Sequence, residues 1–193
     1  MVWRKSSLQN KKTKVYLNPK LDFEIRIRRT LHEPIFSTKV REAGVSTPLI
    51  YFVDPAIAEI VMQYIPGKRV KDILITNTHF DFICKELGRN IAKLHSKQLI
   101  HGDLTTSNFI LLESQKIAFI DFGLSFYSNR LEDKAVDLHL IKEVLTSAHS
   151  QVAKGAFKSI LIGYEEILGS NRLYDIVAKI SEIEERGRYA RPN

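Results

Sequence analysis

The 193-residue sequence has a single cysteine, Cys84, and six prolines. It contains no apolar run near the roughly 20 residues that a membrane-spanning helix needs. One cysteine excludes an internal disulfide and a cysteine-based metal site, and it fits a reducing compartment. The first residues, MVWRKSSLQNKKTK, are basic but lack the apolar stretch of a secretory signal. We therefore expect a protein of the cytoplasm, and of the nucleus if the source is eukaryotic, with no membrane partner.

Acidic residues are fewer than basic ones, which gives a formal net charge of +7. Basic side chains gather near the start (Arg4 to Lys14), near the end (Arg186 to Arg191) and in the cluster Arg26, Arg28 and Arg29. Such charge favours a polyanionic partner, with RNA as the first candidate. A solvated surface explains any single cluster better, but for the three clusters together the sequence leaves both interpretations open.

The length allows one domain, or two small lobes that share a cleft. A helix is expected from Pro19 to Arg41, starting or kinking at Pro34 because proline costs about 3 kcal/mol in a helix interior. Two strands follow, Leu49–Val53 and Ile57–Ile65, and Pro66-Gly67 then breaks the chain. We place the lobe boundary there, with an N-terminal lobe of residues 1–65 and a C-terminal lobe of residues 66–193.

The second lobe is expected to be mostly helical. One core-facing stripe consists of Phe80, Ile83, Leu87, Ile91 and Leu94, and a second consists of Val136, Leu140, Val144 and Ala148. Between them we predict a hairpin of residues 109–112 and 116–120. Residues 157–186 are expected to be helical with a break near Gly169. Strands therefore cluster early and helices late, which predicts an α+β fold of two lobes.

The segment from His101 to Gly123 has the residues that phosphoryl transfer needs. In HGDLTTSN, Asp103 and Asn108 show the Asp-x-x-x-x-Asn spacing of a kinase catalytic loop. This predicts Asp103 as the catalytic base and Asn108 as a Mg²⁺ ligand. After the hairpin, Asp121-Phe122-Gly123 supplies a second metal-binding carboxylate, Asp121. Each piece alone is weak, but their order and spacing together predict a phosphotransferase.

Several other polar residues are expected to support this site. His101 is predicted to bond backbone around the loop, and His95 to pack or cap. Asp137 either accepts backbone amides of the catalytic loop or is an ordinary acidic residue at a helix start. Glu33 either pairs with the lysine that holds the ATP phosphates or is a surface charge.

HGDLTTSN, IDFGLSF and EDKAVDL together resemble the small atypical protein kinase subunit of the KEOPS (EKC) complex. The resemblance covers about Tyr16 to Arg188, through LDFEIRIRRTLHE, REAGVSTP and IVMQYIPG, to the terminal Arg186-Gly187-Arg188, and Thr105-Thr106 is particularly telling. It implies a minimal two-lobed kinase without the usual activation segment, with ATPase and serine/threonine kinase activity. It also implies KEOPS partners, especially the threonylcarbamoyltransferase subunit, and tRNA, whose adenosine beside the anticodon the complex modifies. Eukaryotic members are linked to telomere maintenance.

The chain departs from this family at its start. No glycine precedes Gly44, so the glycine-rich phosphate loop of the family is not found and the N-terminal lobe looks incomplete. Lys5 is the best candidate for the ATP lysine, with Arg4 and Lys11 as rivals. Our hypothesis is that ATP lies between the lobes, with its adenine against the backbone of Gln63, Tyr64 and Ile65 and with Mg²⁺ on Asn108 and Asp121.

Two other functions remain open. Aminoglycoside- or choline-kinase-type phosphotransferases also use HGD, but they need a larger helical substrate region than the residues after Gly123 provide. A non-catalytic kinase-fold scaffold that binds partners and tRNA would fit the missing glycine-rich loop, whereas the intact Asp103, Asn108 and Asp121 oppose it.

Overall fold

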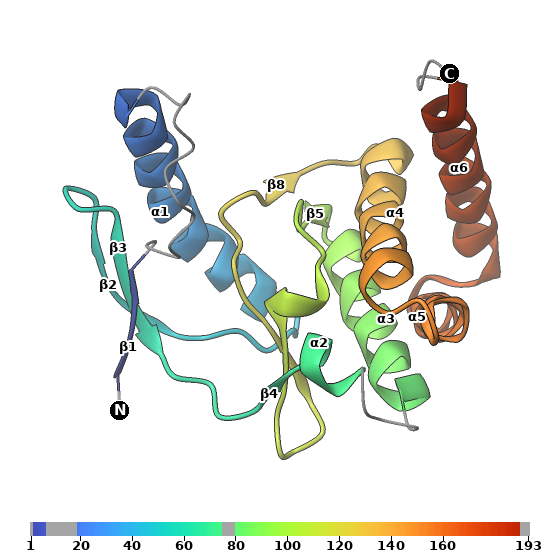
Figure 1. Cartoon of the computed structure of the whole chain (residues 1–193), viewed down its shortest axis with the longest axis horizontal. Helices are drawn as coiled ribbons and strands as arrows, with labels where there is room; N and C mark the ends of the chain where they lie inside the picture. The colour runs from blue at the N-terminus through green and yellow to red at the C-terminus, as the bar shows by residue number, and fades with distance from the viewer. Residues whose placement is uncertain (1, 7–18, 75–79, 190–193) are drawn as a thin grey trace.

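The computed structural model describes the backbone of residues 2–6, 19–74 and 80–189, and the side chains of residues 20–74 and 80–186. Figure 1 shows a sheet and one long helix on one side of the molecule and a group of helices on the other. This arrangement confirms the predicted α+β fold. No helix in the described ranges has the combined length and apolar character needed to cross a membrane.

The first sheet is antiparallel and has the order β1-β3-β2. Its strands are β1 (Val2–Ser6), β2 (Ile50–Asp54) and β3 (Glu59–Gln63). Ile60 and Met62 of the central strand β3 are buried, as alternation along a half-buried strand requires. The two predicted strands are thus confirmed, with bounds shifted by one or two residues.

Helix α1 (Pro19–Glu42) lies beside this sheet and contains Pro34 in its interior. The helix predicted over residues 19–41 is confirmed, and of the two outcomes expected at Pro34 a start is wrong, because the helix begins at Pro19 and continues through the proline. Its ribbon changes direction partway along its length, as a proline inside a helix produces (Figure 1). Phe36 and Val40 of its last turns are buried in the core, so tertiary packing holds the helix together beyond the proline.

The rest of the chain builds the helical part. Its elements are β4 (Lys68–Arg69), α2 (Val70–Ile73), α3 (Phe80–Ser96), β5 (Leu99–Ile100), the 3₁₀ turn η1 (Thr106–Asn108), β6 (Phe109–Leu111), β7 (Ile117–Phe119), β8 (Phe126–Tyr127), α4 (Leu131–Ala148), α5 (Ala153–Leu168) and α6 (Ser170–Tyr189). Strands β4, β6 and β7 form one small sheet, and β5 pairs with β8. The predicted hairpin and the helix break at Gly169 are confirmed. The lobe boundary after Ile65 stays a prediction.

Helices α3 and α5 approach each other unusually closely. A Cβ atom on Gly88 of α3 would lie 1.9 Å from the carbonyl oxygen of Ile160, and one on Gly163 of α5 would lie 1.9 Å from that of Lys85. Each glycine therefore admits the backbone of the other helix. The buried residues Ile83, Leu87, Ile91 and Leu94 of α3 confirm the predicted core stripe.

Helix α4 is where predicted, but the predicted face is wrong. Val136 is 48% exposed and Ala148 is also exposed. The buried residues of α4 are Ala135, Asp137, Leu138, Ile141 and Leu145. The correct stripe contains a carboxylate, which a purely apolar pattern does not select.

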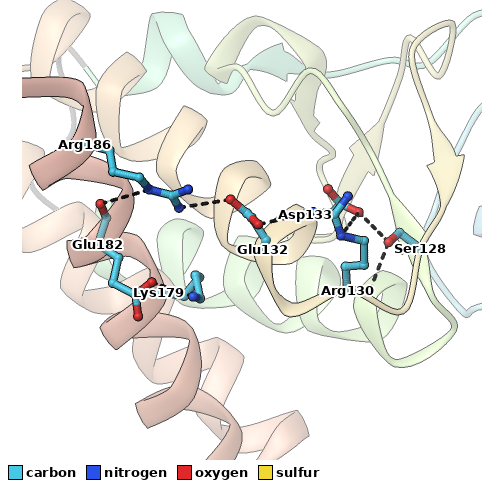
Figure 2. Close-up of polar contacts among 7 residues, drawn as sticks. All are labelled: Ser128, Arg130, Glu132, Asp133, Lys179, Glu182 and Arg186. Carbon is cyan, nitrogen blue, oxygen red and sulfur yellow. Dashed lines mark hydrogen bonds and ion pairs between the residues drawn. The ribbon is translucent and has the colours of Figure 1, made fainter. Parts of the chain in front are cut away.

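Helix α6 is tied to the beginning of α4 by charged side chains (Figure 2). Arg186 of α6 donates through Nη2 to Oε1 of Glu132 at 3.0 Å. Before α4, the hydroxyl of Ser128 donates to the Asp133 carboxylate at 2.5 Å and accepts from the backbone N–H of Arg130 at 3.0 Å. These contacts join the C-terminal helix to the chain that follows Gly123.

Candidate active site

The segment from Ile100 to Asn108 forms a loop between β5 and β6. Gly102 has φ +79°, and a Cβ atom there would lie 2.4 Å from the carbonyl oxygen of Leu124. Only glycine accommodates both this conformation and this contact. The glycine of the HGD sequence therefore lets the chain after Gly123 lie directly against the loop.

Asp103 and Asn108 are brought together within this loop. The side-chain Nδ2 of Asn108 donates to Oδ2 of Asp103 at 2.9 Å and to its carbonyl oxygen at 3.0 Å. Backbone bonds from the N–H of Thr105 to the Asp103 carbonyl and from the N–H of Asn108 to the Thr105 carbonyl, both 2.9 Å, fix the turn. The amide of Asn108 therefore orients the Asp103 carboxylate.

Asp121 reaches the same place through the β6–β7 hairpin. The N–H of Ile120, the residue before it, donates to the carbonyl of Asn108 at 3.0 Å. Asp121 has φ +67°, a left-handed conformation that is uncommon outside glycine and typical of functional positions. The hairpin thus brings Asp121 beside Asn108, as predicted.

The donor atoms at this place fit Mg²⁺. One carboxylate, Asp121, and one amide oxygen, Asn108, are the hard oxygen ligands that Mg²⁺ takes when substrate phosphates and water complete its shell. Within residues 20–74 and 80–186, no three His, Cys, Asp or Glu side chains are grouped to hold a metal on their own. A site completed by phosphate oxygens is therefore the arrangement these residues support.

Asp137 anchors the loop from behind. Its Oδ2 accepts the N–H of His101 and its Oδ1 accepts that of Gly102, both at 2.9 Å. The predicted capture of loop amides is confirmed, but Asp137 lies well inside α4 rather than at its start. Oδ2 also bonds to Nε2 of His95 at 3.2 Å, and Nδ1 of His95 bonds to the Tyr164 hydroxyl at 2.9 Å. His95 is buried, which confirms its packing role.

His101 is a structural residue of the loop. Its ring lies among Phe109, Phe119 and Phe122, and its Nδ1 accepts the N–H of Asp103 at 3.3 Å. Its carbonyl accepts the hydroxyl of Ser125 at 2.9 Å. Burial lowers the pKa of the imidazole despite the nearby carboxylates, which favours its neutral form. The predicted backbone-bonding role is confirmed.

The residues expected to hold ATP from the other side are only partly placed. Glu33 of α1 is 6% exposed, so the surface-charge alternative is wrong. One turn earlier, the Cβ of Arg29 lies 3.2 Å from where a Cβ of Gly123 would be, so α1 packs against the Asp-Phe-Gly segment. The backbone of Lys5 lies in β1 opposite Ile60. The side chains of Lys5 and Arg4, and all of Lys11, lie outside the described residues.

Gln63, Tyr64 and Ile65 end β3 and lead away from it. Oε1 of Gln63 accepts the N–H of Leu49 at 3.2 Å, and its N–H donates to the Leu49 carbonyl at 2.7 Å. Tyr64 is 44% exposed and Ile65 is half-buried. Their contact with adenine stays a prediction.

Among the surface cavities of the described residues, two are lined by residues of helix α1. One of about 430 Å³ is lined by residues of α1 and β2, and one of about 370 Å³ by residues of α1 alone. Neither is lined by Asp103, Asn108 or Asp121. The candidate active site is therefore identified by its chemistry and not by the size of a cavity.

A protein kinase domain model matches residues 10–149 of the chain. The KEOPS complex subunit Bud32 of Pyrococcus abyssi is 42% identical over 178 residues, which cover 91% of this chain and 80% of that protein. The chain belongs to the Bud32 family of protein kinases. It is also 41% identical to a probable bifunctional tRNA threonylcarbamoyladenosine biosynthesis protein of Methanobrevibacter smithii, of which it covers 32%. The Rio2 kinase structure from Chaetomium thermophilum has a TM-score of 0.54 at 18% identity, over 85% of this chain and 56% of that one, and shows the shared fold.

Sequence reasoning missed two contacts of this Bud32-family site. Tyr164 bonds to His95, and His149 bonds to Thr106 through Nε2 and Oγ1 at 3.1 Å. The partners in these bonds are 69 and 43 residues apart along the chain. The one available signal was Thr105-Thr106 itself, which stands out within the catalytic loop.

Proposed function

We propose that this kinase-type phosphotransferase transfers or hydrolyses the γ-phosphate of ATP with Mg²⁺, acting on serine or threonine hydroxyls or on water. The observation that carries the proposal is the Asp103–Asn108 pair, with Asp121 brought beside it by the Ile120–Asn108 backbone bond. Phosphoryl transfer needs mainly positioned charge, and this cluster supplies a base and two metal ligands.

The chain's own residues have distinct tasks in this reaction. Asp121 and the Oδ1 atom of Asn108 would hold Mg²⁺, which when bound neutralises charge on the phosphates. Asp103, oriented by Nδ2 of Asn108, accepts the proton of the attacking hydroxyl or water. Asp137 keeps the loop backbone in place during transfer. Glu33 is proposed to pair with the ATP lysine, for which Lys5 remains the candidate.

The first test is Mg²⁺-dependent ATP turnover by the purified chain and by Asp121→Ala. We expect the variant to lose Mg²⁺-dependent turnover, because the remaining amide ligand cannot hold the metal alone. Asp175→Ala, which changes an exposed aspartate of α6, should retain full turnover. ATPase retained by Asp121→Ala would refute the metal assignment.

Calorimetry with ATP and Mg²⁺ separates the enzyme from the non-catalytic scaffold. An enzyme must bind the nucleotide with a Mg²⁺-dependent heat, whereas a scaffold need not. The small-molecule phosphotransferase alternative is not favoured, because the curated relatives are Bud32 and the threonylcarbamoyladenosine protein.

The names of these relatives support a place in tRNA modification. We propose that the chain assembles with KEOPS subunits, the threonylcarbamoyltransferase subunit above all, and supports threonylcarbamoyladenosine formation beside the anticodon. The bifunctional relative is about three times the length of the region that matches this chain. A fusion of two proteins in one chain would fit a direct contact between this chain and the threonylcarbamoyltransferase subunit.

Reconstitution with the KEOPS subunits of the source organism tests this role. The complex with the wild-type chain should form threonylcarbamoyladenosine on tRNA, and the complex with Asp121→Ala should assemble but form little. Equal modification by both complexes would mean that the chain serves only as a scaffold.

A further inference from the structure

The catalytic loop is also held at its far end, by a bond between two buried side chains. Oγ1 of Thr106 lies 3.1 Å from Nε2 of His149, and the two residues are 2% and 7% exposed. Thr106 opens the 3₁₀ turn η1, which ends at Asn108. The proposed metal ligand therefore sits in the same short turn as the buried hydroxyl.

His149 is itself rigidly placed. It caps the C-terminus of α4, with its N–H donating to the Leu145 carbonyl at 2.9 Å. Its carbonyl accepts the N–H of Val152 at 3.0 Å, at the junction to α5. The imidazole therefore extends from a rigid junction between α4 and α5, and it can restrain the position of a group that it hydrogen-bonds.

Asp137 and His149 form hydrogen bonds to opposite ends of the catalytic loop. Asp137 holds the amides of His101 and Gly102 at one end, and His149 holds the hydroxyl of Thr106 at the other. Helix α4 and its C-cap residue thereby hold both ends of the loop. Asp103 lies along the chain between these two anchored points, and its carboxylate is bonded to Asn108.

We infer that His149 is a positioning residue for Asn108, acting through the Thr106 hydroxyl to fix η1 and so the amide that faces Asp103 and Mg²⁺. The part of this inference that concerns Mg²⁺ rests on the proposed function. The part that concerns the geometry of η1 is independent of that function. A bond that only stabilised the fold would leave the orientation of Asn108 unchanged when removed. A positioning bond would not.

The variants separate these two roles. Thr106→Val and His149→Phe each remove one partner and leave the other buried and unpaired, so both should lower thermal stability. The double variant Thr106→Val/His149→Phe removes both polar groups and should recover much of that stability. Thr106→Ser and His149→Gln keep the bond and are expected to match the wild type in stability and nucleotide binding at pH 7.5.

Thr47→Val is the matched control. Thr47 is buried, and its hydroxyl bonds to that of Ser37 at 3.0 Å, between the loop after α1 and α1 itself. Thr47→Val therefore loses a buried bond away from the catalytic loop, while Ser37 keeps its bond to the Pro48 carbonyl. Its stability should fall while every property of the site is retained.

Two measurements decide the question. The first is the Mg²⁺ concentration at which a fluorescent ADP analogue is half bound, which should rise roughly 10- to 100-fold in Thr106→Val and in the double variant, as for other supporting partners of metal ligands. The second is the side-chain amide NMR signal of Asn108 without nucleotide, which should shift in these two variants and stay in place in Thr106→Ser and Thr47→Val.

The outcomes are distinguishable from failure of the proposed function. A wild-type chain that binds no nucleotide with Mg²⁺ would refute that function, while the Asn108 signal would still test the positioning role. An Asn108 signal that is unchanged in Thr106→Val, His149→Phe and the double variant would overturn the inference. So would a double variant with a wild-type Mg²⁺ midpoint.

Discussion

At the scale of single residues, the site depends on a buried carboxylate that serves several donors. Asp137 is 2% exposed and accepts from His101, Gly102 and His95. A buried charge is tolerated only when such partners replace its lost hydration. Its carboxylate therefore fixes the backbone of His101 and Gly102, the two residues before Asp103.

Asp137→Asn keeps the size of this side chain but replaces one acceptor oxygen with a donor. At least one loop amide is then left unpaired, at a cost of about 1–3 kcal/mol in the free energy of unfolding. We expect this loss in urea unfolding, together with a lower turnover number. Asp54→Asn, at a carboxylate whose one hydrogen bond among the described residues is to the local N–H of Ala56, should change the free energy of unfolding little. Equal effects of the two variants would contradict the anchoring role.

Two buried histidines should make the fold sensitive to mild acid. Burial lowers the pKa of both His101 and His149. Between these lowered values and the ordinary histidine pKa of about 6.5, the unfolded chain binds more protons than the folded one. Stability therefore rises with pH across this window and is lost as pH falls below about 6.5.

Urea unfolding at pH 7.5 and pH 5.5 tests this dependence. The wild-type free energy of unfolding should be lower at pH 5.5, and His149→Gln, which cannot titrate, should lose less between the two values. Near His101 the facing charges are Asp137, Asp103 and Asp121, which oppose the shift without cancelling it. An identical loss in wild type and His149→Gln would exclude His149 as a contributor.

The residue types of the site could be predicted because a motif carries them. Asp103, Asn108 and Asp121 were found from spacing, and the structure brings them together. His149 and Tyr164 could not be found in this way, because their bonds join residues that are distant along the chain. Only the fold decides which distant polar residues meet.

At the scale of helices and strands, periodic patterns located the elements more reliably than their faces. The stripe of α3 was right because Ile83, Leu87, Ile91 and Leu94 are all buried, although Phe82 of the same helix is exposed. Helix α4 has apolar residues on both sides, and its buried side includes Asp137. Pro34 was expected to start or kink the helix, and α1 continues through it because Phe36 and Val40 beyond the proline are buried in the core.

The close packing of α3 on α5 yields a prediction at this scale. Gly163→Ala would place a Cβ atom 1.9 Å from the Lys85 carbonyl oxygen, so the helices must separate. We expect a large fall in thermal unfolding temperature. Gly155→Ala in the same helix meets only the ring edge of Phe80 at 3.1 Å and should change that temperature little, because alanine favours the helix. Similar melting of both variants would show that the two helices can move apart freely.

At the scale of the whole molecule, the net charge of +7 remains the main indication of a polyanionic partner. Arg186 is bonded to Glu132, an exposed pair that adds little stability by itself. Arg188 and Arg191 follow it toward the C-terminus.

Deletion of residues 187–193 should weaken tRNA binding without lowering the unfolding temperature. It removes Arg188 and Arg191, so the salt dependence of tRNA affinity should become shallower by about two phosphate contacts. Lys154→Ala/Lys158→Ala removes two exposed basic residues of α5 and serves as the matched control. Filter binding across a salt series measures both, and an equal loss of affinity would show that charge alone matters and its location does not.

The short stretch between Gly123 and α4 has a consequence for control of the enzyme. Only residues 124–130 lie there; Phe126 and Tyr127 pair with β5, and Ser128 bonds to Asp133. A kinase whose corresponding stretch is long can be switched by rearranging it. Here the β5–β8 pairing and the Ser128–Asp133 bond already hold that stretch in place. We therefore do not expect it to open and close the active site by its own rearrangement. Control of the reaction rate would then depend on the molecules that bind to the enzyme.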